Sequence, residues 1–496
     1  MFASIKSASV IGVQGTVIRV EVHTSSGFPG YTVVGMPDTA MRESKERIRA
    51  ALISSKLKWP QSRMTINLAP ANIRKSGTGA ELAILVGLLC ATGELSKSRF
   101  SDAGVIGELG LDGTIRPVTG TIARVLSLRE SGATQVFVPL PNAYEARLVD
   151  GIEVFPIESV SGLIECLTQA APWPEISQQP DVKAEKNNNG DYGEISGQPL
   201  GCEAMMLLAA GGHHTLLMGS PGIGKTMLAE RLPTILPPLD SAESHEVTAI
   251  ASITNGEVDH LITKRPFRAP HHSLSTPALI GGGSHHIVPG EVTRAHNGVL
   301  FLDELSEYKG AALEALRQPL EKEHVKIARA HFNTTMPASF TLLACSNPCP
   351  CAKPREKCIC TDSIRQRYLR KLSGPLLDRF DVRLELFRSP YVEGTTHSST
   401  SMCERICIAI ERQKNRNSDI NLIKNSRLTS SMLSELAPLS NPVAMLFRNQ
   451  VEKREVSGRG ATAIWRMART IADLDDSPEI NEIHMSRAFD FREEIA

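Results

Sequence analysis

A glycine-rich segment near the middle of the chain has the residue types and spacing of a phosphate-binding loop. Its eight residues are Gly219, Ser220, Pro221, Gly222, Ile223, Gly224, Lys225 and Thr226. Glycines let backbone N–H groups turn toward phosphate oxygens, and the start of a following helix adds partial positive charge. In such loops the lysine contacts the β- and γ-phosphates and the threonine hydroxyl ligates Mg²⁺. We therefore predict that this segment binds ATP together with Mg²⁺.

The segments on either side have the character that such a loop requires. Thr215–Met218 is a short apolar run typical of a buried strand, and residues 227–232 have the pattern of a helix. A strand, the loop and a helix in this order make a chance glycine turn the weaker interpretation.

Two further apolar runs are predicted to be strands that end in polar residues. Val299–Leu302 is followed by Asp303 and Glu304, and residues 340–346 are followed by Asn347. Ligands of open α/β sheets bind at the carboxyl ends of the strands. We expect Asp303 to hold Mg²⁺ and Glu304 to polarise the attacking water. Asn347 would orient that water or contact the γ-phosphate; a turn-forming asparagine before a proline is the alternative.

An arginine further along the chain is a candidate for action on a second subunit. Arg379 lies in residues 374–381, and its guanidinium could reach the γ-phosphate bound by a neighbouring chain. A surface ion pair with Asp378 or Asp381 is the alternative, and the sequence leaves both open.

Four of the ten cysteines form two Cys-x-Cys pairs that could hold a metal. They are Cys349, Cys351, Cys358 and Cys360. Such pairs can converge on one tetrahedral Zn²⁺, although the spacing is tighter than the usual C-x₂-C knuckle. Positive charges between the pairs, on Lys353, Arg355 and Lys357, would offset the thiolates; free thiols in a loop are the alternative. We expect the remaining cysteines to be small buried apolar residues, namely Cys90, Cys166, Cys202, Cys345, Cys403 and Cys407.

Composition narrows the class of protein that carries these motifs. The chain has 496 residues, with 54 Lys+Arg balanced by 54 Asp+Glu. Zero net charge excludes binding to nucleic acid through bulk positive charge, but not through a local basic channel. No apolar run approaches the ~20 residues that span a bilayer, and the N-terminus lacks a signal-peptide layout. We expect a cytoplasmic protein without membrane association, whose cysteines stay reduced.

The pattern of elements predicts an α/β protein of about three domains. Residues 1–171 mix strands with helices, including a helix that begins after Asp38, and form an α+β domain. Residues 172–198 are rich in proline, asparagine and charge, which is typical of a linker. Residues 199–394 form the phosphate-loop domain, and residues 402–496 form a helical domain in which 457–474 have helical periodicity.

Several longer motifs resemble one family. They are residues 265–272 (RPFRAPHH), 281–283 (GGG), 289–291 (PGE), 295–305 (AHNGVLFLDEL), 347–351 (NPCPC) and 373–379 (SGPLLDR). In this order they resemble the magnesium-chelatase-like branch of AAA+ ATPases, and over the whole chain they resemble the bacterial ComM/YifB-type proteins. The resemblance implies an AAA+ αβα core and a C-terminal helical lid.

The resemblance also implies how the protein would work. ATP would bind between subunits of a ring, usually a hexamer, with Arg379 as arginine finger. Arg459 matches the second sensor arginine of the lid, and Arg466 and Arg469 are competitors for that role. The ring would move on single-stranded or branched DNA, in branch migration during integration of transforming DNA, and recombination proteins would be its partners. The alternative is a chelatase-like or chaperone-type motor that remodels a protein.

An inserted loop of the family projects toward the ring pore and corresponds to residues 256–290. Its basic and imidazole groups would contact DNA phosphates there; they are Lys264, Arg265, Arg268, His271, His272, His285 and His286. Alternatively, His271 and His272 cap or pack within the fold.

The N-terminal domain resembles a different family. Residues 107–120 (GELGLDGTIRPVTG) and 132–139 resemble the core of Lon-type proteases, which use a Ser–Lys dyad. Gly79 falls at or near the serine position and Arg124 at the lysine position, although Ser76 and Thr78 are close. Arginine stays protonated and cannot act as a general base. We therefore expect a Lon-like domain without peptidase activity, used for ring assembly or substrate docking.

Overall fold

A computed structural model describes residues 1–71, 77–176, 190–256, 258–283, 287–329, 332–353, 357–369, 371–387, 397–418 and 424–492. The chain divides into two compact units. Unit 1 comprises Met1–Lys183, Ser241–Ile262 and Ala328–Met336, and unit 2 comprises Ala184–Asp240, Thr263–Ile327 and Pro337–Ala496. The domain limits expected from the sequence remain predictions.

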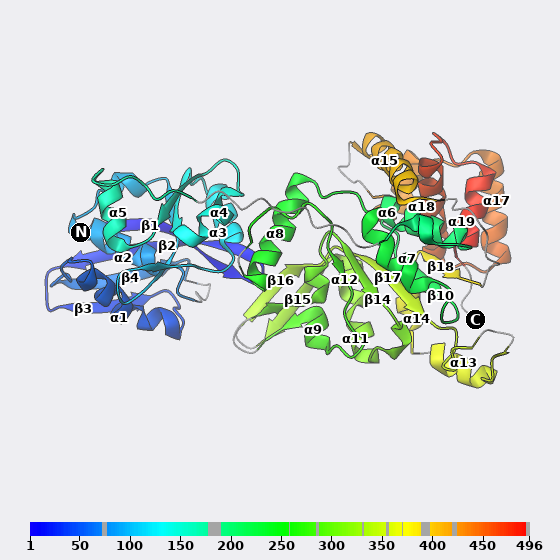
Figure 1. The fold of residues 1–496 in the computed structure, drawn as a ribbon, viewed down its shortest axis with the longest axis horizontal. Coiled ribbons are helices and arrows are strands. Elements are labelled where there is room, and N and C mark those ends of the chain that lie inside the picture. Colours follow the sequence, from blue (N-terminus) through cyan, green and yellow to red (C-terminus); the bar gives the residue numbers. More distant parts are fainter. Residues whose placement is uncertain are drawn as a thin grey trace. The chain divides into compact units, whose positions relative to one another are not determined.

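Unit 1 is built on a seven-stranded mixed sheet in the order β3-β4-β2-β1-β5-β8-β9 (Figure 1). The strands are β1 (Phe2–Ile11), β2 (Gln14–Ser25), β3 (Gly30–Val34), β4 (Arg63–Ala69), β5 (Ala103–Val105), β8 (Gln135–Pro139) and β9 (Glu153–Ile157). The β1–β2 and β2–β4 pairs are antiparallel, whereas β3–β4, β1–β5, β5–β8 and β8–β9 are parallel. A mixed sheet with helices agrees with the α+β prediction for this part of the chain.

Helices of unit 1 pack on the sheet through apolar faces. They are α1 (Thr39–Ser54), α2 (Glu81–Thr92), α3 (Thr121–Glu130), α4 (Leu140–Arg147), α5 (Val160–Leu167) and α8 (Ser241–Asn255). Asp38 caps α1 as predicted, because its carboxylate accepts a hydrogen bond from Met41 N at 2.8 Å. Met41, Ile48 and Leu52 are buried on the inner face of α1.

Helix α8 belongs to unit 1 although the sequence around it belongs to unit 2. Its Ala249 and Ile253 pack into an apolar cluster with residues of α3 and α4. The Ser252 hydroxyl donates to the buried Glu145 carboxylate, and the Leu148 carbonyl accepts a hydrogen bond from His245 Nε2 at 3.0 Å. The helix is therefore held by both apolar and polar contacts within unit 1.

Aromatic residues anchor both ends of the predicted linker. Trp173 packs edge-on against Phe155 in unit 1, with ring centroids 4.9 Å apart. Tyr192 is 1% exposed in unit 2, and its hydroxyl donates to Leu228 O at 2.7 Å. Residues 177–189 lie outside the described residues. The packed structure thus extends past residue 171 on one side and begins before residue 199 on the other.

Unit 2 contains a five-stranded sheet in which every pairing is parallel, in the order β11-β14-β17-β10-β18. The strands are β10 (Thr215–Met218), β11 (Phe267–Arg268), β14 (Val299–Leu302), β17 (Thr341–Ser346) and β18 (Val382–Glu385). All residues of β10, β14 and β17 are buried, which agrees with the apolar runs from which these strands were predicted. Because the strands are parallel, their carboxyl ends meet along one edge of the sheet.

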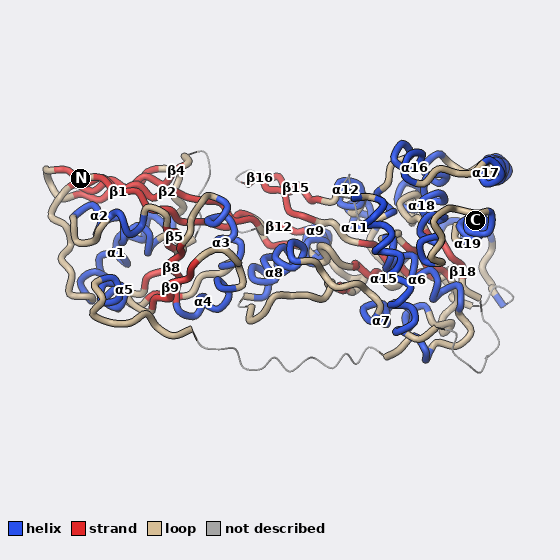
Figure 2. The backbone as a smooth tube through the Cα atoms, turned by 90° about the horizontal axis from the view of Figure 1, so that it is seen from above, coloured by secondary structure: helices blue, strands red, loops and turns tan. Residues whose placement is uncertain are grey.

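Helices cover this sheet and continue into a helical C-terminal part (Figure 2). The helices α6 (Pro199–Gly211) and α7 (Lys225–Arg231) pack on the sheet, and α12 (Arg317–Lys322) and α13 (Asp362–Leu369) are further helices of unit 2. The C-terminal helices are α15 (Ser399–Arg416), α16 (Ser430–Leu436), α17 (Asn441–Lys453), α18 (Gly458–Leu474) and α19 (Glu482–Asp490). Helix α18 covers most of the segment with predicted helical periodicity and buries an apolar stripe of Ile464, Met467, Ala468, Ile471 and Leu474. In the described ranges, no helix has both the length and the apolar character that crossing a membrane requires.

Candidate active site

The glycine-rich loop connects β10 to α7 at the carboxyl edge of the unit 2 sheet. Gly222 and Gly224 have φ angles of 76° and 96°, in the left-handed region that favours glycine. A Cβ added at either position would meet no atom within 4 Å, so the backbone conformation, not crowding, requires glycine. The sequence-predicted loop residues 219–226 therefore form a continuous turn into α7.

Lys225 places a positive charge inside this loop. Its Nζ donates to Gly219 O at 2.6 Å, Ser220 O at 3.0 Å and Asn347 Oδ1 at 3.2 Å. The residue is 8% exposed, and burial lowers the pKa of its ammonium group. These three acceptors are neutral, so the lysine charge is left for an anion such as a phosphate.

Thr226 and Asp303 bring oxygen ligands beside the loop. Thr226 Oγ1 donates to Asp303 Oδ2 at 3.1 Å, although the two residues come from different strand ends. Asp303 Oδ1 accepts a hydrogen bond from Glu304 N at 2.8 Å, which fixes the carboxylate plane. A hydroxyl and a carboxylate are oxygen donors of the kind Mg²⁺ prefers, so these residues fit a nucleotide-bound Mg²⁺.

Glu304 has a partner that we did not predict. Its φ is 50°, and its carboxylate Oε2 lies 3.3 Å from His272 Nδ1. His272 follows β11, which is parallel to β14, so both residues reach the same sheet edge. His272 also stacks on His271, with ring centroids 4.1 Å apart, and lies edge-on to Tyr308. Its position after a strand parallel to β14 was the signal that could have revealed it, but β11 has only two residues.

Arg379 lies at the opposite edge of the same sheet. It precedes β18 by three residues, and β18 pairs in parallel with β10 so that Val382 is opposite Thr215. The four residues of β10 span about 13 Å, more than an arginine side chain can bridge. Arg379 therefore cannot reach the phosphate loop of its own chain in this conformation.

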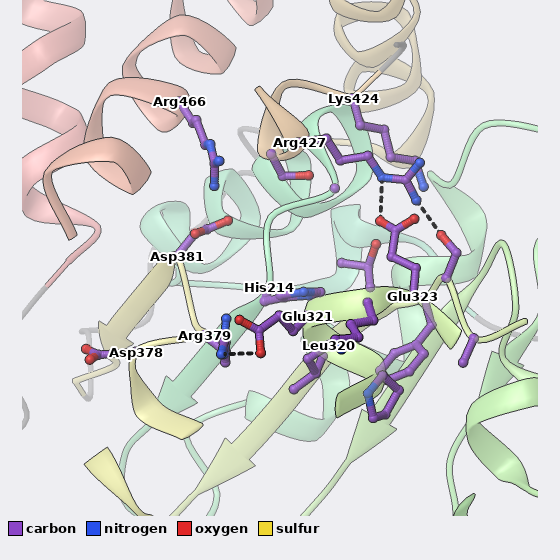
Figure 3. Close-up of a pocket in the computed structure, with 18 of the residues that line it drawn as sticks. His214, Leu320, Glu321, Glu323, Asp378, Arg379, Asp381, Lys424, Arg427 and Arg466 are labelled. Carbon is purple, nitrogen blue, oxygen red and sulfur yellow. Dashed lines mark hydrogen bonds and ion pairs between the residues drawn. The ribbon is translucent and has the colours of Figure 1, made fainter. Parts of the chain in front are cut away.

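The contacts of Arg379 differ from the ion pairs considered in the sequence. Its Nη2 lies 3.1 Å from Glu321 Oε2 of α12 (Figure 3). Asp378 instead pairs with Arg383, and Asp381 pairs with His213. Among the described residues, the buried Nε of Arg379 has no hydrogen-bond partner. The Arg379 guanidinium is thus held by the Glu321 carboxylate, while its Nε–H donor has no acceptor among the described residues.

A cavity of about 490 Å³ surrounds Arg379, and charged side chains line it. Its cations are Lys322, Arg379, Lys424, Arg427, Arg459 and Arg466. Its carboxylates are Glu321, Glu323, Asp378 and Asp381. Figure 3 shows Arg427 paired with Glu323 and Arg379 paired with Glu321, on opposite sides of the cavity. The cations outnumber the acids, which suits an anionic ligand.

The three second-sensor candidates occupy different environments. Arg469 is 2% exposed and pairs with Asp473 at 2.9 Å, and it also donates to two backbone carbonyls. Arg466 lines the cavity, but its Nε donates to Leu428 O at 2.5 Å. Arg459 lines the same cavity with its side chain 48% exposed, 3.9 Å from Glu321. Of the three, Arg459 is therefore the most available to a ligand, while Arg469 is held inside the helical part.

The four cysteines of the Cys-x-Cys pairs lie together just after Asn347. Their sulfurs are all within 4.8 Å of one another. Lys353 and Lys357, between the two pairs, are among the described residues, and Arg355 lies outside them.

The other cysteines only partly match the expectation that they are buried. Cys90, Cys166, Cys202 and Cys345 are buried as expected. Cys407 is exposed and Cys403 is partly exposed. The prediction was wrong for these two because α15 is amphipathic and Cys407 falls on its outer face.

Two basic residues of the expected pore loop are held by contacts within unit 2. Arg265 Nη1 donates to Asn297 O at 2.7 Å, and Arg268 makes two hydrogen bonds to Glu291, at 2.7 and 3.1 Å. Lys264 is exposed. His285 and His286 lie outside the described residues. The contacts of this segment favour a structural role for Arg265 and Arg268.

The position in unit 1 that corresponds to the Lon serine has a geometry that disfavours a side chain. A Cβ on Gly79 would lie 2.9 Å from Arg124 Nη1, so the guanidinium occupies the space of a side chain. Arg124 Nε donates to Thr119 O at 3.1 Å and its Nη1 donates to Ala8 O, which ties α3 to β1. The Thr78 hydroxyl is bonded to the Glu108 carboxylate, and Ser76 lies outside the described residues.

The fold and these residues together define a class. A phosphate loop follows an inner strand of an all-parallel sheet, and Asp303, at the end of a strand one place removed in that sheet, accepts a hydrogen bond from the loop threonine. This is the arrangement of a P-loop ATPase.

Comparisons with known proteins narrow the class to a family. Residues 191–393 match the family described as magnesium chelatase, subunit ChlI; residues 20–142 match subunit ChlI of Mg-chelatase; and residues 396–492 match its C-terminal family. The first of these matches begins at residue 191, next to the Tyr192 anchor of unit 2.

Full-length relatives agree with this match. An uncharacterized protein of Mycobacterium tuberculosis (strain ATCC 25618 / H37Rv) is 38% identical, covering 97% of both chains. The uncharacterized protein YifB of Escherichia coli (strain K12) is 36% identical, covering 98% of this chain and 96% of the relative. Competence protein ComM of Haemophilus influenzae is 36% identical, covering 99% and 97%. The chain belongs to the ComM/YifB-type magnesium-chelatase-like family and is an AAA+ ATPase-like protein.

A further relative is matched over a smaller part of the chain. Lon protease of Mycolicibacterium smegmatis is 25% identical over 175 residues, which is 33% of this chain and 22% of the protease.

Proposed function

We propose that the protein is a ring-forming ATPase that couples ATP hydrolysis to movement on DNA. The observation that carries this proposal is the division of the charged groups between two edges of one sheet. Lys225 and Asp303 stand at the carboxyl edge, whereas Arg379 and Arg459 line a cavity at the amino edge. A ring of head-to-tail subunits would bring the arginines of one chain to the phosphates bound by the next.

Within one chain, each residue at the carboxyl edge has a role in this proposal. The loop N–H groups and Lys225 would hold the phosphates, and Thr226 and Asp303 would hold Mg²⁺, which neutralises phosphate charge. Glu304 would accept a proton from the attacking water, with His272 at 3.3 Å orienting its carboxylate. Asn347 contacts the Lys225 ammonium and would sense the γ-phosphate from the end of β17.

Between chains, the cavity at the amino edge of one subunit's sheet would supply cations to the ATP bound by the next subunit. Arg379 would leave Glu321 and donate to the γ-phosphate, since its Nε is unpartnered among the described residues. Arg459 would act as the second sensor from the same cavity. Two guanidiniums on one phosphate stabilise the charge of the transition state.

The similarity to competence protein ComM over nearly the full chain supports DNA as the substrate of the motor. Its action would be branch migration during integration of transforming DNA, with a hexamer as the working assembly and recombination proteins as partners. With zero net charge, DNA would be gripped by a few groups repeated around the ring.

The test is ATP turnover with and without single-stranded or branched DNA, at low salt. We expect DNA to bind and to raise turnover, and the Lys225→Ala variant to lose turnover under both conditions. If wild type hydrolyses ATP but neither DNA binds or stimulates it, the DNA motor is refuted.

A chelatase-like or chaperone-type motor that remodels a protein is the second candidate, favoured by the family described as magnesium chelatase, subunit ChlI. This candidate would be supported if the rate of ATP hydrolysis by wild-type protein is unchanged by DNA but changes when a protein partner is added.

A further inference from the structure

The four clustered cysteines have the geometry of a metal site. Sulfur–sulfur distances are 3.3 Å for Cys349–Cys351, 3.5 Å for Cys349–Cys358 and 3.6 Å for Cys351–Cys358. A tetrahedron with Zn–S bonds of about 2.3 Å has edges of about 3.8 Å. A disulfide would need sulfurs about 2.05 Å apart. The observed spacing is therefore close to that of four thiolates around one ion.

We propose that Cys349, Cys351, Cys358 and Cys360 bind one Zn²⁺ as a tetrathiolate site, and that this ion positions Asn347. Four sulfur ligands in a tetrahedron select zinc or iron over magnesium or calcium. The site would carry two negative charges, and a cation stands beside it, since the Arg365 guanidinium of α13 lies near Cys358.

The cysteines occupy a junction between three parts of the ATPase core. Cys349 comes two residues after Asn347, whose side chain accepts a hydrogen bond from Lys225. Cys360 comes two residues before α13. One ion bound to all four sulfurs would therefore tie the end of β17 to the start of α13.

Helix α13 in turn contacts the segment that follows the acidic pair. Tyr368 is 7% exposed, and its hydroxyl lies beside the side chains of Ser306 and Ser346. These two serines are joined to each other at 2.7 Å, and Lys371 Nζ donates to Ser306 O at 3.3 Å. Ser306 stands two residues after Glu304. The proposed zinc thus supports both β17 and the turn that carries Glu304.

This support predicts a separation between nucleotide binding and hydrolysis. Loss of the metal would free Asn347 and the turn beyond Asp303, whereas the glycine loop between β10 and α7 would stay in place. We expect ATP turnover to fall by about tenfold or more, with nucleotide affinity changed much less. This second part rests on the proposed ATPase function.

The metal itself is tested without any activity measurement. The full chain is purified without chelators, and zinc and iron are measured by mass spectrometry. We expect about one zinc per chain in wild type and in Cys407→Ser, a control at an exposed cysteine. Cys358→Ser should hold at least about tenfold less. Replacing zinc with Co²⁺ in wild type should give the intense absorption bands of tetrahedral thiolate cobalt.

Several results would overturn the site. The site is overturned if wild-type protein holds less than about a tenth of an equivalent of zinc per chain, or if it holds iron instead of zinc. It is also overturned if the double variant Cys358→Ser with Cys360→Ser retains zinc. If the cysteine variants fail to fold, the wild-type zinc content and cobalt spectrum still decide. The positioning of Asn347 would be refuted if wild-type protein binds zinc but Cys358→Ser and Cys407→Ser have equal ATP turnover and equal nucleotide affinity. Wild-type protein that binds zinc but never hydrolyses ATP would refute the ATPase proposal instead and leave the metal site standing.

Discussion

If Arg379 acts on the ATP of a neighbouring chain, two inactive variants should restore each other. Lys225→Ala removes the ammonium group of the phosphate loop and keeps Arg379. Arg379→Ala removes the guanidinium and keeps the phosphate loop. Each alone should lower turnover by about 10³-fold, the lower end of the effect of an arginine finger. Arg379→Ala should still bind ATP, because its loop is intact.

The recovery in a mixed ring can be worked out from the placement of the two groups. In a 1:1 mixture, half of the interfaces have an intact loop, and half of those face a chain with an intact Arg379. About one quarter of the interfaces are then complete, so turnover should return to about a quarter of wild type if the interfaces act independently. Steady-state phosphate release after mixing and subunit exchange measures this.

A matched mixture provides the control. Lys225→Ala combined with Asp303→Ala should stay inactive, because both defects fall on the loop side and no interface is complete. Glu321→Gln tests the simpler explanation that Arg379 only forms an ion pair, since that variant breaks the same pair. The reasoning is refuted if the first mixture recovers no more than its separate components, or if Glu321→Gln impairs turnover as much as Arg379→Ala.

Three further predictions concern stability, each measured by chemical or thermal unfolding. Gly79→Ser should lower the free energy of unfolding of unit 1 by about 1–3 kcal/mol through overlap with Arg124, and should create no peptidase activity. Arg47→Ala should cost about 3–5 kcal/mol, because it leaves the fully buried Glu81 without the guanidinium 2.6 Å away; an unchanged midpoint would contradict this. Tyr192→Phe should cost about 1 kcal/mol by removing its hydrogen bond to α7, and a larger loss would point to a packing change.

Local signals in the sequence predicted the carboxyl edge of the unit 2 sheet well. Strands β10 and β14 are short, mostly apolar runs whose four residues are all buried, as in strands of a parallel sheet covered on both faces. Polar residues directly after such strands fall at one edge because the strands of this sheet are parallel. The Thr226–Asp303 contact follows from this rule, although the strands lie far apart in the sequence.

Contacts that depend on tertiary packing could not be predicted from local signals in the sequence. The partner of Arg379 is Glu321, on a helix from a distant part of the chain, and not the acids beside it in sequence. His272 reaches Glu304 because a two-residue strand joins the sheet edge, which is too short to leave a periodic pattern. The burial of cysteines on α15 depended on which face of an amphipathic helix packs inward.

The return of α8 and of residues 328–336 to unit 1 has a consequence for dissecting the gene. The polypeptide passes from one unit to the other five times, so a single cut in the predicted linker separates neither. A product ending at residue 183 would lack the helix that covers part of its own apolar cluster, and a product starting at residue 184 would carry that helix with its partner surface missing. Neither half is a transferable module; a soluble N-terminal unit would need α8 grafted back by a designed connection.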